Sequence, residues 1–159
     1  MTTEPNFEVH AIEAGVLARV RTSGVDVSGN PVAAVRADGG EPLRCCLRNA
    51  TPGEALIVFG YEPPIGATPY REIGAVFAHA DACSGQRAAS YPAAWRGKPQ
   101  VLRAYDRRGW IHDAVVHDGS DPEGAIAKLL ADPEVVQLHS RNVAYGCFMF
   151  TVTRSWSPA

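Results

Sequence analysis

The sequence lacks the long apolar runs that membrane-spanning and secreted chains carry. Its longest uninterrupted apolar run covers residues 55–59, which suits a β-strand and falls far short of the ~18 residues that a membrane-spanning helix needs. The first ten residues include Glu4, Pro5 and Glu8 and have neither the basic start nor the apolar core of a secretory signal peptide. We therefore expect a cytoplasmic protein with no membrane partner.

An excess of positive charge and the commonest catalytic motifs are also missing. Fifteen Lys and Arg residues face seventeen Asp and Glu residues, for a net charge of -2, so no general field attracts nucleic acid and we expect no such partner. The chain contains no P-loop, dinucleotide fingerprint, Gly-x-Ser-x-Gly elbow, His-Glu-x-x-His pair or Cys-x-x-Cys pair. These absences exclude the usual signatures of nucleotide-binding proteins, serine hydrolases, zinc proteases and dithiol oxidoreductases.

What is present is the composition of one folded domain covering residues 1–159. The chain is 46% hydrophobic and 20% charged, and a chain of this length buries enough surface to fold without disulfides or a metal. Fifteen glycines and twelve prolines indicate many turns and short elements. In a reducing compartment the four cysteines, Cys45, Cys46, Cys83 and Cys147, are expected as thiols.

The hydrophobic pattern predicts hairpins with one well-marked helix. Residues 120–123 form a Ser-x-x-Glu capping box with an early proline and precede a helical repeat that ends at Asp132-Pro133. A second, short helix is expected at 16–20 and ends by Gly24. Residues 81–99 show no clear period and predict a long irregular connection. Alternation of apolar and polar residues predicts strands at 7–12, 43–48, 55–59, 73–79, 101–105, 110–116, 135–141 and 145–153.

Strands that follow one another through short turns favour an antiparallel sheet. The expected hairpins join 43–48 to 55–59, 101–105 to 110–116, and 135–141 to 145–153. The predicted fold class is therefore α+β, a mostly antiparallel sheet built from hairpins with one or two helices packed on it.

The last hairpin supplies the most specific functional hypothesis. A turn centred on Val143 sets His139 opposite Cys147, with both side chains on one face. Cross-strand Cβ atoms in that relation lie about 4.5–5.5 Å apart, close enough for an imidazole to take a thiol proton. This register predicts a catalytic dyad of Cys147 as nucleophile and His139 as base, with His79 as a third catalytic candidate. The alternative is an inert thiol beside a core histidine.

Arginine and tyrosine side chains predict a pocket for a small polar or anionic ligand. Arg141 lies two residues after His139, on the same face, where its charge favours a thiolate. A planar guanidinium and a neutral tyrosine hydroxyl suit a carboxylate or phosphate group. Scattered surface arginines are the alternative. The candidate ligand-binding residues are Arg44, Arg71, Arg103, Arg141, Tyr70 and Tyr105.

A metal site is a competing use of the same residue types. His79 and Cys83 lie four residues apart, and with His139 and Cys147 they would make a His₂Cys₂ set that zinc accepts. Only one pair of ligands is closely spaced, so this set is the weaker alternative. Apart from this alternative, we expect no metal ligand among the site residues and no cofactor.

Four stretches carry a resemblance to a known family. They read PLRCCL at 42–47, TPYREIGAVFAH at 68–79, LRAYD at 102–106 and LHSRNVAYGCF at 138–148. Together they resemble a family of short bacterial proteins, the domain-of-unknown-function family numbered 1203, over nearly the whole chain. This chain has Gly74-Ala75 where the family has Gly-Pro. The resemblance implies a single cytoplasmic domain of this length and implies no activity, substrate or catalytic residue.

Three functions stay open at this point. The first is a small enzyme that uses Cys147 and His139 for acyl or alkyl transfer on a polar or anionic metabolite. The second is a ligand-binding or interaction module in which the same arginines hold an anion without catalysis. The third is a zinc-binding domain. The oligomeric state and the roles of Cys45, Cys46 and Cys83 are not predicted.

Overall fold

The computed structural model describes residues 6–83, 87–88 and 90–155. Its helices are α1 (Ala14–Ser23) and α2 (Pro122–Leu130), with a short 3₁₀ helix η1 (Ala93–Trp95). Its strands are β1 (Phe7–His10), β2 (Ala33–Arg36), β3 (Pro42–Leu43), β4 (Arg48–Asn49), β5 (Ala55–Tyr61), β6 (Gly74–His79), β7 (Arg87–Ala88), β8 (Gln100–Asp106), β9 (Ile111–His117), β10 (Val135–Asn142) and β11 (Phe148–Arg154).

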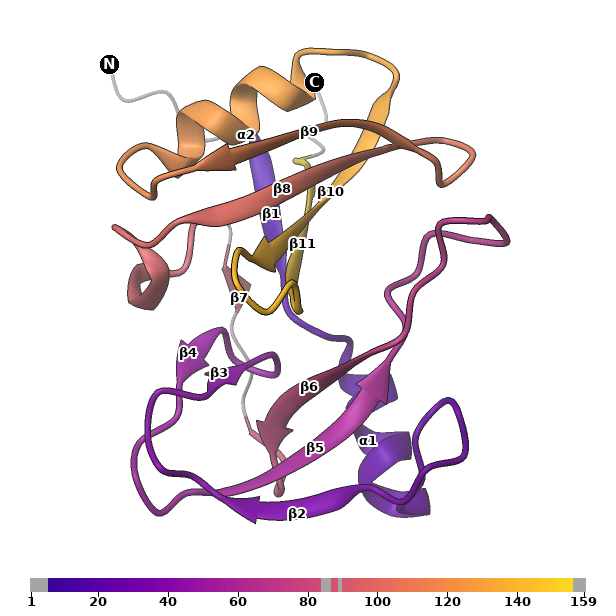
Figure 1. Ribbon diagram of the computed structural model, residues 1–159, viewed down its shortest axis with the longest axis vertical. Helices are drawn as coiled ribbons and strands as arrows, with labels where there is room; N and C mark the ends of the chain where they lie inside the picture. The colour runs from indigo at the N-terminus through magenta and orange to yellow at the C-terminus, as the bar shows by residue number, and fades with distance from the viewer. Residues whose placement is uncertain (1–5, 84–86, 89, 156–159) are drawn as a thin grey trace.

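These strands form two sheets. A six-stranded sheet has the order β7-β1-β11-β10-β8-β9, and a five-stranded sheet has the order β2-β5-β6-β3-β4. In Figure 1 the six-stranded sheet and α2 occupy the upper half of the molecule, and the five-stranded sheet and α1 occupy the lower half. The α+β class with mostly antiparallel pairing is confirmed, although the strands are divided between two sheets. No helix among the described residues is long and apolar enough to cross a membrane.

The helices begin and end close to the predicted signals. Helix α1 ends at Gly24, whose φ of 71° lies in the left-handed region that closes many helices. Helix α2 has proline in its first turn, but its N-cap is Asp121, whose side chain accepts the backbone N–H of Gly124 at 3.0 Å. The predicted cap, Ser120, instead donates its hydroxyl to Asp118.

Several strand predictions hold. Strands β8 and β9 pair as the expected hairpin, and β10 pairs with both β8 and β11. Strand β2 was not predicted, because all four of its residues are exposed and give no alternating pattern. Of the expected irregular connection at 81–99, residues 84–86 and 89 lie outside the described part, and the rest includes β7 and η1.

The predicted strand at 43–48 is wrong. The chain makes a tight turn at residues 44–47 between β3 and β4, and β3 runs parallel to β6 with Leu43 paired to Phe77. Leu47 has a φ of 56°, the single positive φ among the described non-glycine residues. Strand β5 pairs with β2 and β6, so the expected hairpin of 43–48 with 55–59 does not form. The alternating pattern has another cause: Leu43, Cys45 and Leu47 are all buried, but in two different cores.

One core lies around α2 and the six-stranded sheet, and the other lies around α1 and the five-stranded sheet. We call them the α2 core and the α1 core. Leu47, from the turn of the five-stranded sheet, packs in the α2 core. Phe148, from β11 of the six-stranded sheet, packs in the α1 core, where its ring lies 5.4 Å from that of Tyr61. Each core therefore contains a side chain from the opposite sheet.

Arg44 links the two sheets through buried hydrogen bonds. Its side chain is 1% exposed, and it donates from Nε to the Phe148 carbonyl at 2.8 Å and from Nη1 to the Pro42 carbonyl at 2.6 Å. Burial lowers the pKa of Arg44 to about 10, an effect opposed by the nearby Cys147. On the other side of the turn, Trp95 donates its indole N–H to the Asn49 side chain at 2.8 Å.

The final hairpin has a register different from the predicted one. The loop covers Val143 to Cys147 instead of a tight turn at Val143, and a bulge follows Ser140. His139 therefore pairs with Thr151, and Cys147 lies in the loop before β11.

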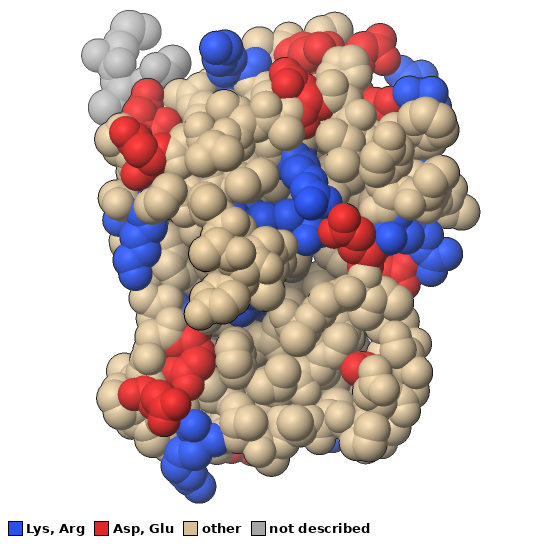
Figure 2. Space-filling model, in the orientation of Figure 1, with Lys and Arg blue, Asp and Glu red and all other residues tan. Residues whose placement is uncertain are grey.

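Figure 2 shows both basic and acidic side chains on one face of the molecule. On the face shown in Figure 2, Lys and Arg side chains gather in the hollow between the two halves, with acidic groups at its edge. The net charge of the chain therefore did not indicate this local group of positive side chains.

We expect Arg44→Lys to destabilise the protein by about 1–3 kcal/mol, since the single nitrogen of lysine cannot occupy the positions of both Nε and Nη1, and a buried carbonyl left without a donor costs about that much. Urea unfolding measures the change. Arg36→Lys is the matched control, because Arg36 also donates to a carbonyl, that of Gly53, but at an exposed site. A loss of stability as large for Arg36→Lys as for Arg44→Lys would contradict the role of Arg44.

Candidate metal centre

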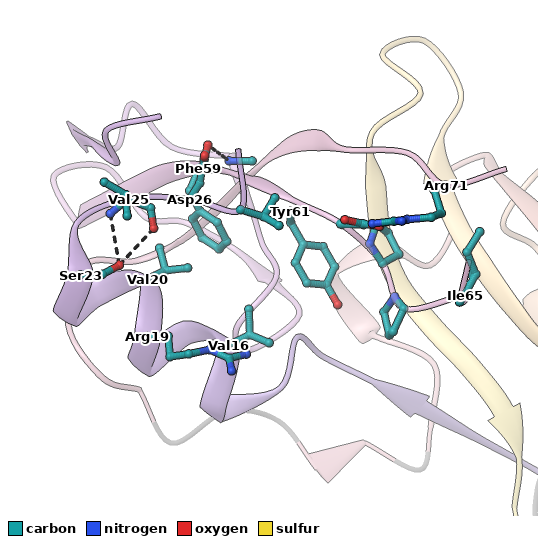
Figure 3. Close-up of a pocket in the computed structure, with 16 residues that line it drawn as sticks. Val16, Arg19, Val20, Ser23, Val25, Asp26, Phe59, Tyr61, Ile65 and Arg71 are labelled. Atoms are coloured by element: carbon teal, nitrogen blue, oxygen red, sulfur yellow. Dashed lines mark hydrogen bonds and ion pairs between the residues drawn. The ribbon is translucent and has the colours of Figure 1, made fainter. Parts of the chain in front are cut away.

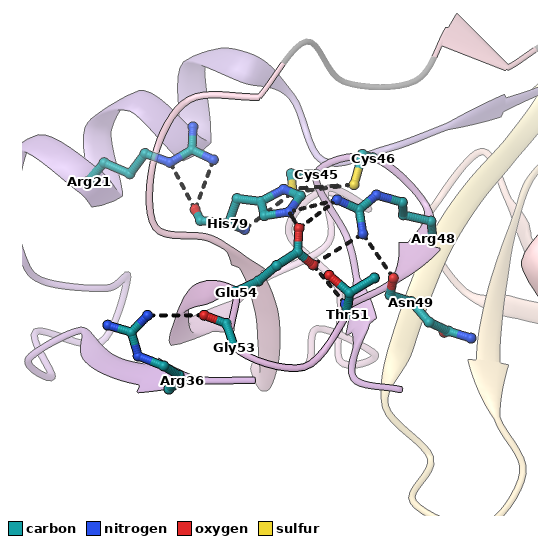
Figure 4. Close-up of polar contacts among 10 residues, drawn as sticks. All are labelled: Arg21, Arg36, Cys45, Cys46, Arg48, Asn49, Thr51, Gly53, Glu54 and His79. Atoms are coloured by element: carbon teal, nitrogen blue, oxygen red, sulfur yellow. Dashed lines mark hydrogen bonds and ion pairs between the residues drawn. The ribbon is translucent and has the colours of Figure 1, made fainter. Parts of the chain in front are cut away.

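Three thiols and one imidazole meet beside the tight turn. Cys45 and Cys46 lie in the turn, His79 ends β6, and Cys83 follows four residues later. One potential ligand atom from each of the four lies within 4.8 Å of the others. The Cys45 and Cys46 sulfurs are 3.9 Å apart, and Nδ1 of His79 is 3.3 Å and 3.9 Å from them (Figure 4). We call these four residues the Cys/His cluster.

The parallel pairing of β3 with β6 explains why these residues meet. The Arg44 N–H donates to the Phe77 carbonyl at 2.9 Å, which places the start of the turn beside the end of β6. The next contact along is the His79 N–H, which donates to the Cys45 sulfur at 3.3 Å. The turn then brings two adjacent sulfurs to one side, whereas an extended strand would point them to opposite faces.

The ring of His79 is held from both sides. Its Nδ1 faces the two sulfurs, while its Nε2 lies 3.2 Å from a Glu54 carboxylate oxygen and 3.1 Å from Nη2 of Arg48. Glu54 is fixed in turn by Arg48 at 2.8 Å and by the Thr51 N–H at 2.8 Å. If Nδ1 were to ligate a metal, the ring proton would be on Nε2, which would donate a hydrogen bond to Glu54. If Nδ1 carries the proton, Nε2 instead accepts a hydrogen bond from Arg48.

The electrostatics of the Cys/His cluster favour one thiolate. The hydrogen bond donated by the Cys45 thiol lowers the pKa of Cys46, and burial opposes this effect. The same hydrogen bond, together with burial, raises the pKa of Cys45. Arg48 and the Thr51 N–H hold the pKa of Glu54 well below its usual range, so this carboxylate stays charged beside His79.

The distances suit a tetrahedral zinc ion. With bonds of about 2.3 Å to sulfur and about 2.0 Å to nitrogen, two sulfurs on one zinc lie about 3.8 Å apart, and a sulfur and a nitrogen about 3.5 Å apart. The observed separations of 3.9, 3.3 and 3.9 Å are close to these values. A cavity of about 220 Å³ lined by Glu54, His79 and Cys83, among others, gives access from solvent.

Two of the four residues named in the metal alternative lie in the Cys/His cluster. The structure brings His79 and Cys83 together, as their spacing indicated, but the other two members are Cys45 and Cys46 instead of His139 and Cys147. The signal in the sequence was the adjacent cysteine pair. It was missed because a strand at 43–48 separates the two side chains, and only the turn unites them.

The premise of the predicted catalytic dyad is wrong. His139 pairs with Thr151 and is fully buried, with its ring 4.5 Å from that of Tyr105 and 5.3 Å from that of Phe148. Its Nε2 lies 3.0 Å from the Gln137 side-chain oxygen, and its Nδ1 has no partner. Cys147 instead contacts the Tyr145 carbonyl at 3.9 Å. The turn is longer than predicted, so the cross-strand relation between thiol and imidazole does not exist.

Arg103 and Arg141, two of the candidate ligand-binding residues, come together beside His139 because β8 pairs with β10, a pairing that the sequence did not predict. Arg103 is the cross-strand partner of His139, and both arginines contact one carboxylate, that of Glu72. Nothing in the alternating pattern of these strands pointed to Glu72, which comes from the loop between β5 and β6.

The remaining candidates lie elsewhere. Arg44 is buried between the sheets, and Tyr70 packs against Trp110 with ring centroids 5.7 Å apart. Arg71 pairs with Glu62 at the rim of a cavity of about 550 Å³ (Figure 3). The walls of this cavity come from α1, the 25–27 segment, β5 and the 62–66 segment. The predicted ligand-binding residues are therefore divided among several places.

Comparisons with known proteins give one match. A family model described as "Protein of unknown function (DUF1203)" matches residues 40–154, which is well over half of the chain. Neither a curated protein nor a solved structure matches. The matched range contains all four residues of the Cys/His cluster and both arginines that contact Glu72.

The environment of His139 predicts acid sensitivity. Burial, followed by the charges of Arg141 and Arg103, lowers the pKa of His139 to about 3, whereas an unfolded histidine has a pKa of about 6.5. Between these values only the unfolded chain binds the proton, so stability falls as the pH drops below about 6.5, by at most about 1.4 kcal/mol per pH unit.

Urea unfolding between pH 7 and pH 5, above the range in which most carboxylates titrate, measures this loss. His139→Gln keeps a polar group beside Gln137 and cannot take a proton there, so its stability should fall less over the same range. Equal slopes for the two proteins would show that His139 does not cause the sensitivity.

Proposed function

Since the chain belongs to the DUF1203 family, whose description assigns no activity, we infer its function from its own side chains. We propose that it binds one zinc ion through the Cys/His cluster. Three thiolates and an imidazole are a common donor set for structural zinc. The ion joins the tight turn to the end of β6 and so stabilises the junction between β3 and β6.

One observation carries the proposal, the orientation of the His79 ring. Its Nδ1 faces the Cys45 and Cys46 sulfurs, and its Nε2 faces Glu54 at 3.2 Å. A ligating histidine almost always gives its second ring N–H to a carboxylate or carbonyl, which fixes the ring and its tautomer. Glu54 supplies that partner, and two further donors hold Glu54 in place.

Zinc suits these ligands better than hard cations do. Thiolates favour zinc or copper(I), while calcium and magnesium take oxygen ligands. Four protein ligands leave no open position for a reacting water, which is typical of a structural site and not of a catalytic one. A structural role also fits the place of the cluster at the turn that links the two sheets.

The acyl- or alkyl-transfer hypothesis does not form part of this proposal. It required Cys147 and His139 to face each other across the last hairpin, and His139 pairs with Thr151.

We expect the metal-free protein to take up one equivalent of zinc per chain and to unfold at a higher temperature with it, because a ligand bound only by the folded state stabilises that state. Elemental analysis after dialysis and thermal unfolding measure the two effects. Cys46→Ser and Cys83→Ser should lose stoichiometric zinc, while the control Cys147→Ser should retain it. Less than half an equivalent in the parent protein, or retention by both ligand variants, would overturn the proposal.

Glu54→Gln tests the support of His79 without removing a ligand. Loss of such a partner typically weakens metal affinity 10–100-fold, and we expect a change in that range in competition with a zinc chelator. The control is Glu123→Gln, because Glu123 also pairs with an arginine, Arg96, far from the cluster in sequence. Equal zinc affinity in the two variants would contradict the role of Glu54.

A further inference from the structure

Two arginines of the six-stranded sheet share one carboxylate from the other half of the molecule. Nη1 of Arg103, on β8, lies 3.0 Å from Oε1 of Glu72, and Nη2 of Arg141, on β10, lies 2.8 Å from Oε2. Glu72 belongs to the loop that joins β5 to β6. The carboxylate thus bridges two guanidinium groups, one oxygen to each.

The arginines have more donors than this contact uses. The Arg141 side chain is 10% exposed, and its Nη1 donates to the Gly146 carbonyl at 3.0 Å, but its Nε is buried without an acceptor. His139, beside both arginines, has a lowered pKa and is neutral near pH 7, so it neither adds nor removes charge there. Two permanent cations therefore face one anion, and at least one buried N–H group lacks an oxygen.

Glu72 is far less firmly held than the groups it contacts. Its side chain is 45% exposed, while the Arg103 side chain is 27% exposed and the Arg141 side chain 10%. An exposed carboxylate on a loop contributes little net stability through such a pair. The two guanidinium groups stand on paired strands of one sheet, so their spacing is set by the sheet and not by the loop that carries Glu72.

We infer that Arg103 and Arg141 form a binding site for a small molecule that carries a carboxylate or phosphate group, and that Glu72 occupies this site in the absence of the ligand. The side chain of Glu72 places an oxygen on each guanidinium, as one end of such a ligand does. The ligand displaces Glu72, so Glu72 acts as an internal competitor that lowers the apparent affinity. This site uses none of the residues of the Cys/His cluster and stands independently of zinc binding.

The shape of the ligand group follows from the donors. A phosphate has more oxygens than a carboxylate and reaches the unpartnered Nε of Arg141 as well as the two terminal nitrogens. A carboxylate ligand makes the same two contacts as Glu72, to Arg103 and Arg141, and leaves Nε of Arg141 without a partner. Malonate and inorganic phosphate, as two probes, separate these chemistries.

The experiment compares the full-length parent protein with Glu72→Gln, in which the competing charge is removed and the size of the side chain is kept. Isothermal titration with inorganic phosphate and with malonate should show at least twofold tighter binding of one of them to Glu72→Gln, in keeping with the small net stability of the contacts that are removed. Adding Arg103→Lys or Arg141→Lys to Glu72→Gln should abolish the gain, because lysine cannot offer the planar fork. We use two lysine variants so that, if one of them does not fold, the other still tests the inference.

Glu62→Gln is the matched control. It removes the same charge from the same loop and releases a different arginine, Arg71, on the rim of the cavity in Figure 3. It should bind both probes as the parent does. If Glu72→Gln binds neither probe more tightly than Glu62→Gln does, the ion pairs of Glu72 serve only to connect the two halves of the molecule, and the inference is overturned. Retention of the gain in the lysine variants would overturn it as well.

Discussion

The buried guanidinium of Arg44 is the interaction on which the rest of the structure depends. Its side chain donates to carbonyls of β11 and β3, and its own backbone bonds to Phe77 and Ile12. One residue thus fixes the six-stranded sheet, the tight turn and β6 relative to one another. The hydrogen bond to the Phe148 carbonyl is fully buried, so that carbonyl has no water to replace the donor that Arg44 provides. The exchange of Leu47 and Phe148 between the two cores reinforces the same junction.

Both candidate sites lie on segments that this junction positions. The Cys/His cluster uses the turn that begins at Arg44 and the end of β6, which pairs with β3 beside it. The arginine pair stands on the six-stranded sheet and contacts Glu72 just before β6 begins. The end of β6 therefore carries a residue of the Cys/His cluster, and the loop before its start carries the carboxylate that contacts the arginine pair. Neither site is contiguous in the sequence.

The sequence predicted the elements whose burial follows a single periodicity. Strand β8, α1 and α2 each bury one apolar face in one core, so their patterns are legible. Strand β9 was predicted from its short turn to β8, although none of its residues is buried. The segment 43–48 was mispredicted because its apolar residues enter two cores, which imitates the alternation of a strand. The register of the last hairpin failed for a different reason: residue types alone did not reveal the five-residue loop or the bulge. The predicted dyad of Cys147 and His139 rested on that register. Arg103 and Arg141 were each named as ligand-binding candidates, but their approach follows from the pairing of β8 with β10, which was not predicted.

The parallel alignment of β3 with β6 also sets an order of assembly. Thirty-odd residues separate Cys46 from His79, and β5 lies between them in the chain and pairs with β6 in the sheet. Closing so distant a contact costs chain entropy that only the completed sheet repays. The residues of the Cys/His cluster thus become neighbours late, and if the cluster binds zinc as proposed, uptake of the ion would report that the five-stranded sheet is complete.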